Sequence, residues 1–268
     1  MAFGWINPEE FSFNSFLMME RFQIRWMFES RGNDTAWRRN MGLALRANPA
    51  VAWYFGRKCP ECANAVREIA ERAPVHASPE KIREAEVYCL AHSEDFVTYT
   101  RPEMMDTSCD FIYGWDENRL HEMADFAGKT VLDVGSGSGR LAFTVTKRAM
   151  WVYASEPVDT LREFMRDKMK REGIANMWVV DGMCHALPYP DDTFDIVMHG
   201  HAVGNDWDAE LDELARVCKP GGWLLSCPGD QPRKQKPCKE LMERGWEEMR
   251  YKGSFGEDVY RYRKQNCK

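Results

Sequence analysis

Features that a membrane or secreted protein needs are missing from this sequence of 268 residues. No apolar run approaches the ~20 residues that span a bilayer. The start, MAFGWINPEEFSF, has neither a basic region nor a long apolar stretch, so we expect no secretion signal. The nine cysteines are odd in number and irregularly spaced, which disfavours a disulfide framework and fits a reducing compartment. We therefore expect a cytoplasmic protein without a membrane partner.

An excess of positive charge is missing as well. The formal net charge is −6, whereas a dedicated nucleic-acid-binding domain is usually basic, so we expect no nucleic-acid partner. Hydrophobic residues make up 44% of the chain and charged residues 29%, which is typical of a soluble globular protein. This length suits one core domain with a smaller attached part.

The N-terminal part has apolar residues at helical spacing and carries no recognisable motif. The pattern predicts helices over 16–30, 61–72 and 79–99, the last beginning at the start signal Ser78-Pro79. No strand, repeat or low-complexity tract is expected there. We interpret residues 1–110 as a helical lid or substrate-binding region, because amphipathic helices rich in Trp and Met need a surface to cover.

Residues 111–268 alternate between short apolar runs and helical stretches. Strands are expected at 130–134, 151–155, 177–180, 194–198 and 222–226. Helices are expected at 141–148, 158–172, 209–218 and 237–245, and a hairpin closes the chain at 246–263. Such alternation is typical of α/β proteins. It predicts a Rossmann-like, seven-stranded, mostly parallel sheet with helices on both faces.

The segment VLDVGSGSGR joins the first expected strand to a helix. Gly135, Gly137 and Gly139 let the backbone turn sharply and let a ligand approach the main chain. A tight turn without a ligand would produce the same glycines. The acid Glu156, about twenty residues later at the end of the second strand, strengthens the ligand interpretation, because in doubly wound folds this acid accepts hydrogen bonds from a ribose.

These residues resemble the class I S-adenosylmethionine-dependent methyltransferases, in particular the type that includes the ubiquinone and menaquinone C-methyltransferases. The family's loop, D-x-G-x-G-x-G, matches Asp133 to Gly139, and the nicotinamide fingerprint G-x-G-x-x-G does not fit. The family's later motifs match YASEP, FDIVMHGH and Lys219-Pro-Gly-Gly222, so the resemblance covers roughly residues 113–262. It implies S-adenosyl-L-methionine as cofactor and a methyl transfer as the reaction.

The resemblance also implies a set of cofactor-binding residues along the loops that follow the strands. They are Asp133, Gly135, Ser136, Gly137, Gly139, Glu156, Pro157, Asp181, Gly182, Met183, His199 and Gly200. One departure matters: the family often has Asp where Met183 stands here, and Asp181 lies two residues earlier. Either Asp181 reaches the adenine, or Met183 covers the ring and its backbone N–H makes the contact.

The reaction itself needs little from the protein, since the sulfonium methyl group is already activated and the acceptor must mainly be aligned with it. A general base helps only an acceptor that must lose a proton. His199 and His201, just beyond the fourth strand, are the candidate catalytic bases; the alternative is local hydrogen bonding within the loop. Four further residues are expected to line the acceptor site: Tyr113, Trp115, Trp207 and Arg233.

Two other patterns leave alternatives open. Cys59, Cys62, Cys89 and His92 have the spacing of a zinc site, but their helical flanks equally predict four residues on helices without a metal. Residues 21–58 carry a surplus of six positive charges, and a second basic group follows the fifth strand around Arg233. Such cations either bind an acidic ligand or form a solvated face.

Three functions compete. The first is direct in-line methyl transfer to a small-molecule acceptor, whose accepting atom (O, N, S or C) the sequence does not indicate. The alternative is an RNA or protein methyltransferase that docks its substrate on residues 21–58. The third is a module that keeps the fold without turnover, which the intact glycine loop and Glu156 disfavour. The sequence does not indicate the oligomeric state.

Overall fold

The computed structural model describes residues 7–93, 97–108, 116–229, 235–253 and 256–268. The chain divides into two compact units, Met1–Arg101 and Pro102–Lys268. The first is helical and the second contains a β-sheet. In the described part of the chain no helix is long and apolar enough to cross a membrane.

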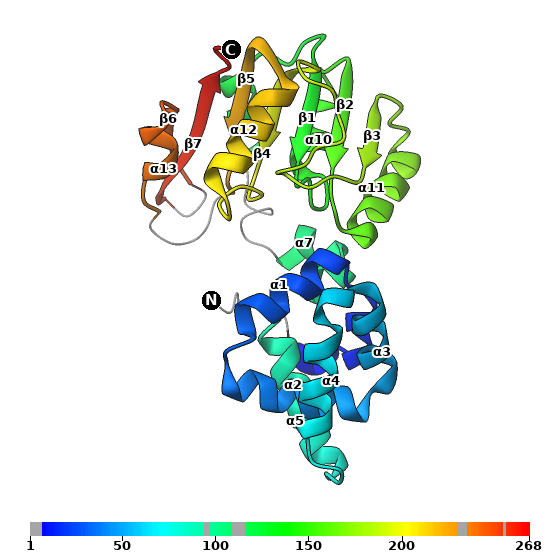
Figure 1. Ribbon diagram of the computed structural model, residues 1–268. Helices are drawn as coiled ribbons and strands as arrows, with labels where there is room; N and C mark the ends of the chain where they lie inside the picture. Colours follow the sequence, from blue (N-terminus) through cyan, green and yellow to red (C-terminus); the bar gives the residue numbers. More distant parts are fainter. Residues whose placement is uncertain (1–6, 94–96, 109–115, 230–234, 254–255) are drawn as a thin grey trace. The chain divides into compact units, whose positions relative to one another are not determined.

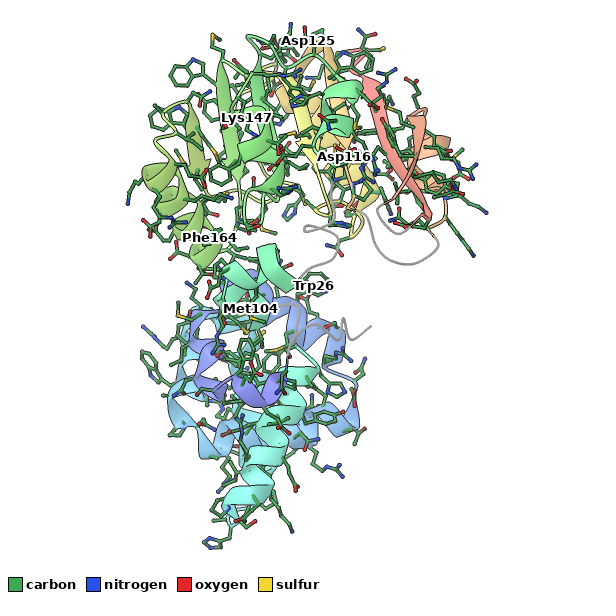
Figure 2. The ribbon with its side chains drawn as sticks, turned by 180° about the vertical axis from the view of Figure 1, so that it is seen from behind. Trp26, Met104, Asp116, Asp125, Lys147 and Phe164 are labelled. Carbon is green, nitrogen blue, oxygen red and sulfur yellow. The ribbon has the colours of Figure 1, made fainter. Side chains whose placement is uncertain are left out.

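Short helices build the described part of the first unit (Figures 1 and 2). In chain order they are η1 (Pro8–Glu10), η2 (Phe13–Met18), α1 (Arg21–Arg31), α2 (Thr35–Ala47), α3 (Pro49–Lys58), η3 (Pro60–Cys62), α4 (Ala63–Arg72), α5 (Pro79–Ala91) and η4 (Thr98–Thr100). Aromatic rings meet edge to face at the centre of this unit: Phe28 contacts both Trp37 and Phe55. All three side chains are buried, so the aromatic residues at helical spacing form a core.

Side-chain caps mark the starts of two of the longer helices, α2 and α5. The carboxylate of Asp34 accepts hydrogen bonds from the backbone N–H groups of Ala36 and Trp37 and starts α2. Ser78 caps α5 as expected, but the prediction that this helix continues to residue 99 is wrong. It ends at Ala91, where the ring of His92 stacks on Tyr88 and its Nδ1 lies 2.8 Å from the Tyr88 carbonyl oxygen.

The second unit contains a seven-stranded sheet in the order β3-β2-β1-β4-β5-β7-β6 (Figure 1). Its strands are β1 (Thr130–Val134), β2 (Trp151–Ser155), β3 (Met177–Val180), β4 (Phe194–His199), β5 (Cys218–Ser226), β6 (Glu247–Lys252) and β7 (Asp258–Gln265). The first five are parallel, and β7 pairs antiparallel with both β5 and β6. The expected Rossmann-like, mostly parallel sheet with a closing hairpin is confirmed.

Helices cover both faces of this sheet. Apolar residues of α9 (Asn118–Met123), α10 (Arg140–Val145) and α11 (Asp159–Glu172) pack on one face. Those of α12 (Trp207–Val217) and α13 (Lys239–Glu243) pack on the other. A further short helix, α7 (Glu103–Ser108), precedes the sheet. Because the strands are covered on both sides, the loops after their carboxyl ends are where a ligand site is expected.

Candidate functional site

The glycine loop between β1 and α10 has a backbone that only glycine adopts easily. The φ angles of Gly135, Gly137 and Gly139 are 65°, 57° and 89°. A Cβ on Gly135 would lie 2.4 Å from the Cβ of Ala202, and a Cβ on Gly139 would lie 2.6 Å from the ring of Phe143. The loop therefore packs directly against the segment that follows β4 at Gly135 and against α10 at Gly139, and neither position has room for a side chain.

Hydrogen bonds tie this loop to the end of β2. The carbonyl oxygen of Ser155 accepts from the backbone N–H groups of Gly135 and Ser136, at 2.8 and 3.1 Å. The hydroxyl of Ser136 donates to the carbonyl oxygen of Asp133 at 2.9 Å. The path of the loop is thus fixed by its own backbone and by the neighbouring strand.

Glu156 follows β2 and lies against the glycine loop. One carboxylate oxygen accepts from the N–H of Gly137 and the other from the N–H of Val158, each at 2.9 Å, so the chain bends past Pro157 around the carboxyl group. The side chain is 5% exposed, and burial raises the pKa of Glu156 to about 7 in spite of these two bonds. Each oxygen keeps a second lone pair for a further donor.

Asp133 places a second buried carboxyl group beside the loop. Its Oδ2 accepts from the N–H of Ala142 at 3.1 Å, and its Oδ1 has no hydrogen-bond partner within the described ranges. Burial raises the pKa of Asp133 to about 8, although bonds from Ala142 and Ser136 act in the opposite direction. A buried acceptor without a donor is costly, so this atom suits a ligand that brings one.

The loop after β3 contains Asp181, Gly182 and Met183. The Asp181 side chain is 73% exposed and pairs with Arg162 at 3.4 Å. Gly182 is buried, and a Cβ on it would lie 2.9 Å from Pro188. Met183 is partly buried in a tight turn closed by a bond from the N–H of Ala186. Both alternatives for the adenine contact, through Asp181 or through Met183, remain predictions.

The end of β4 holds the two histidines in very different surroundings. His199 is 3% exposed, and neither ring nitrogen has a hydrogen-bond partner in the part of the chain that the structure describes. Burial, with a smaller effect of His201, lowers the pKa of His199 to about 3. His201 is exposed, and its Nε2 accepts from the N–H of Gly229 at 3.1 Å. Gly200 separates them and lies near the carbonyl oxygen of Cys227.

Comparison with known proteins agrees with this geometry. Residues 131–222, from β1 into β5, match the family model of a methyltransferase domain. A ubiquinone/menaquinone biosynthesis C-methyltransferase of Marinomonas sp. is 31% identical over 45% of this chain and 51% of its own length. A demethylmenaquinone methyltransferase of Geobacillus kaustophilus is 30% identical over 44% and 53%. The chain thus spans about half the length of the curated relatives that it matches.

The fold is similar to that of a solved S-adenosylmethionine-dependent methyltransferase from Aquifex aeolicus. The TM-score is 0.51 with 21% identity, covering 62% of this chain and 96% of that one. The strand order and the matched loop agree with the family likeness. The chain contains a class I S-adenosylmethionine-dependent methyltransferase domain. The resemblance inferred from the sequence motifs is therefore confirmed.

The residues of the methyltransferase domain fit the cofactor of its class. The glycine loop lies at the carboxyl end of β1, where a ligand site is expected in a sheet of this kind. Glu156 could offer carboxylate lone pairs to sugar hydroxyls, and Oδ1 of Asp133 is an acceptor that lacks a donor among the described residues. S-adenosylmethionine has hydroxyl donors in its ribose, which suit Glu156, and N–H donors in its ammonium group, which suit Asp133. The acceptors of the protein therefore match the donors of the cofactor in kind.

Some of the expected acceptor-site residues lie outside the described residues: Tyr113, Trp115 and Arg233. Trp207 is described and begins α12 beside Gly204, where a Cβ would meet the indole at 3.7 Å. It is partly buried against the sheet face covered by α12. The roles of these residues in acceptor binding remain predictions.

Glu210 of α12 is a site residue that the sequence analysis missed. It is 2% exposed, and one carboxylate oxygen accepts from the N–H groups of Gly204 and Asn205 at 2.7 and 3.3 Å. It thereby fixes the loop after β4, which carries His201. A carboxylate on an amphipathic helix normally faces solvent, so its spacing gave no signal of this role.

Among the described residues, the zinc alternative finds no third ligand beside Cys59 and Cys62. The sulfur atoms of Cys59 and Cys62 lie 3.3 Å apart, and Cys89 is buried in α5. Within the described ranges, no group of three or more His, Cys, Asp or Glu side chains could hold a metal ion. A zinc site therefore does not explain why the two thiols lie in contact.

Ion pairs use up much of the positive surplus of residues 21–58. Arg21, Arg25, Arg38 and Lys58 each pair with an acidic side chain of the same helical unit. The guanidinium of Arg46 donates to backbone carbonyl oxygens at the end of α4. This pairing favours the interpretation that these cations serve the protein's own acids, and it weakens the case for an acidic ligand there.

Proposed function

We propose that the whole chain is an S-adenosylmethionine-dependent methyltransferase that methylates a small molecule by direct in-line transfer. The observation that carries this proposal is the glycine loop held against the buried carboxyl group of Glu156. The small-molecule part draws support from the net charge of −6 and from relatives named for ubiquinone and menaquinone biosynthesis. The helical N-terminal unit is proposed to contribute acceptor binding.

The chemistry of the site follows from what each group can do. The bound cofactor supplies an activated methyl group. The glycine loop and Glu156 fix the position of the donor, and Asp133 accepts a hydrogen bond from its cationic end. The acceptor then needs alignment and shelter from water, which together lower the barrier without covalent catalysis.

We propose His201, in preference to His199, as the group that takes a proton from the acceptor. His199 is neutral at physiological pH, but both of its nitrogens are buried away from any substrate. His201 is exposed, and the neighbouring Ala202 packs against Gly135, so this segment adjoins the glycine loop. His201 is therefore closer to where an acceptor must approach, and its Nε2 takes the proton on releasing the Gly229 N–H from which it accepts.

Replacing His201 with Gln tests this assignment. The amide oxygen of Gln can still accept the bond from Gly229, so the loop should keep its path, but the base is lost. We expect kcat to fall roughly 10²–10⁴-fold while the Kd of S-adenosylhomocysteine stays within about twofold. His199→Gln is the matched control and should keep most of kcat. Equal losses in both variants would contradict the assignment of the base to His201.

A screen of purified full-length protein with methyl-labelled cofactor tests the proposed function. We expect label to enter one class of small metabolites, and calorimetry to show micromolar binding of S-adenosylhomocysteine. Labelling of bulk RNA or of cell protein, with no labelled metabolite, would instead support the docking function of residues 21–58. Cofactor binding without any labelled product would favour a module that has lost turnover.

A further inference from the structure

Cys59 and Cys62 lie at the corner where α3 meets α4 in the helical unit. Their sulfur atoms are 3.3 Å apart, with the Cys59 thiol donating to the Cys62 sulfur. The turn between them is already closed, because the N–H of Cys62 donates to the carbonyl oxygen of Cys59 at 3.0 Å. To form a disulfide, the two sulfurs need to approach to about 2.05 Å, a movement of little more than an ångström.

Neighbouring contacts hold this corner in place. Glu61, between the two cysteines, receives two hydrogen bonds from the guanidinium of Arg21 on α1, at 3.0 and 3.1 Å. Pro60 fixes the backbone at the first position of η3. The chain between the sulfurs therefore has little freedom to separate them, which raises their effective concentration toward each other.

We propose that Cys59 and Cys62 form a redox-active dithiol that is reversibly converted to an intrachain disulfide. The proposal is independent of the methyltransferase function. In a reducing compartment a disulfide of this kind is transient and serves as a sensor more than as a permanent link. Two thiols in direct contact, with the sulfur atoms 3.3 Å apart, are what a dithiol–disulfide pair requires.

The oxidant is a low-molecular-weight disulfide such as oxidised glutathione. The Cys62 thiol, 6% exposed against 0% for Cys59, loses its proton and attacks one glutathione sulfur, which gives a mixed disulfide and one glutathione thiol. Cys59 then loses its proton and attacks the Cys62 sulfur, which releases the second glutathione. Two protein thiols are oxidised by two electrons, and one glutathione disulfide is reduced to two thiols.

Burial sets the rate of this exchange. It raises the pKa of both thiols, that of Cys59 to about 12, so only a small fraction is thiolate at neutral pH. The donated bond from Cys59 partly offsets this effect at Cys62, which supports Cys62 as the attacking sulfur. Thiol–disulfide exchange at this pair is therefore expected to be slow. The reaction must be followed until the fractions of reduced, glutathione-bound and disulfide forms stop changing.

The test uses the full-length protein in glutathione buffers of increasing oxidised fraction. Samples are quenched with acid, alkylated with iodoacetamide in denaturant and cleaved with trypsin after Lys58 and Arg67. We expect the peptide 59–67 to lose two hydrogen atoms and both alkylation sites as the buffer becomes oxidising, and to regain them with dithiothreitol. The thermal midpoint of the oxidised protein should be roughly 2–4 °C higher, since a crosslink restricts the unfolded chain.

Three variants separate the outcomes. Cys59→Ser and Cys62→Ser should abolish both the mass change and the rise in thermal midpoint. Cys267→Ser, at an exposed position, should leave both unchanged. A peptide that stays fully alkylated at the highest oxidised fraction would overturn the proposal. So would a reaction that stops at glutathione bound to Cys62, because Cys59 would then fail to resolve the mixed disulfide.

Discussion

Gly135→Ala should abolish measurable cofactor binding and destabilise the methyltransferase domain. The new Cβ would lie 2.4 Å from the Cβ of Ala202, and both atoms belong to short, rigid side chains that cannot turn aside. The backbone must also keep a φ of 65°, which an L side chain rarely adopts. We expect the free energy of unfolding to fall by about 3–5 kcal/mol and the Kd of S-adenosylhomocysteine to rise more than roughly 100-fold.

Gly173→Ala is the matched control for this variant. Gly173 ends α11 with a φ of 67°, almost the angle of Gly135, but a Cβ there would meet nothing within 4 Å. Backbone strain alone should cost about 1 kcal/mol, with cofactor affinity unchanged. Urea unfolding and calorimetry of the two variants separate strain from steric overlap. Similar behaviour of the two proteins would mean that Ala202 yields and that the close packing has no functional consequence.

The two regions of the chain differ in how far the sequence predicted their structure. Strands β1, β2 and β3 begin and end where the apolar runs predicted, because each is a short apolar run in the parallel part of the sheet and is followed by a glycine or an acidic residue. In the helical unit, α2 and α3 were not predicted, since their arginines and small residues interrupt the apolar pattern. Tertiary contacts around Trp37 and Phe55 outweigh those weak signals.

The start of β5 shows a limit of local sequence reasoning. The segment Lys219–Gly222 resembles a turn, and we expected the strand to begin at Gly222, whereas it begins at Cys218. The reason lies 44 residues away: Gly221 N–H donates to the carbonyl oxygen of Asn266, and Asn266 N–H donates to that of Gly222. The Asn266 amide also donates to the carbonyl oxygens of Cys218 and Lys219. A distant partner thus makes extended structure from residues that locally favour a turn.

The candidate site divides in a similar way. The sequence alone indicated the glycine loop and Glu156. Their proposed role in cofactor binding depends on backbone conformation and on position after a strand, and both are visible as a sequence motif. It did not distinguish His199 from His201, which differ in burial and not in spacing. The carboxylate of Glu210 was missed for the same reason. Burial of a polar group depends on the packing of several elements, and a single sequence does not show it.

Glu156→Gln should weaken S-adenosylhomocysteine binding about 5–150-fold, which corresponds to about 1–3 kcal/mol for a lost acceptor of sugar hydroxyls. The amide has one acceptor oxygen where the carboxylate has two, and both carboxylate oxygens already accept backbone bonds from Gly137 and Val158. In the Gln variant, the amide NH₂ group would replace one carboxylate oxygen. The backbone N–H that bonded to that oxygen would then face a donor and lose its hydrogen bond. Calorimetry at one fixed pH, with a thermal scan to confirm folding, measures the effect.

The pH dependence of binding distinguishes the role of this charge from a general loss of structure. Burial raises the pKa of Glu156 from about 4.5 to about 7 in the protein without cofactor. A raised pKa means that the contribution of this group to stability is present below about pH 4.5 and is lost as the pH rises through 7. Ribose hydroxyls donate to the ionised carboxylate and favour it. Cofactor affinity should therefore increase up to about tenfold from pH 6 to pH 8.

The variant Glu156→Gln supplies the reference for that experiment, because an amide does not titrate. Its affinity should change much less over the same range, so the difference between the two proteins reports mainly on the carboxyl group of Glu156. Burial raises the pKa of Asp133 to about 8 and the charge of Glu156 adds to this effect, so removing that charge should slightly lower the pKa of Asp133 in the variant. Parallel pH profiles in wild type and variant would show that Glu156 is already ionised at pH 6 and would contradict the effect of burial assigned to it.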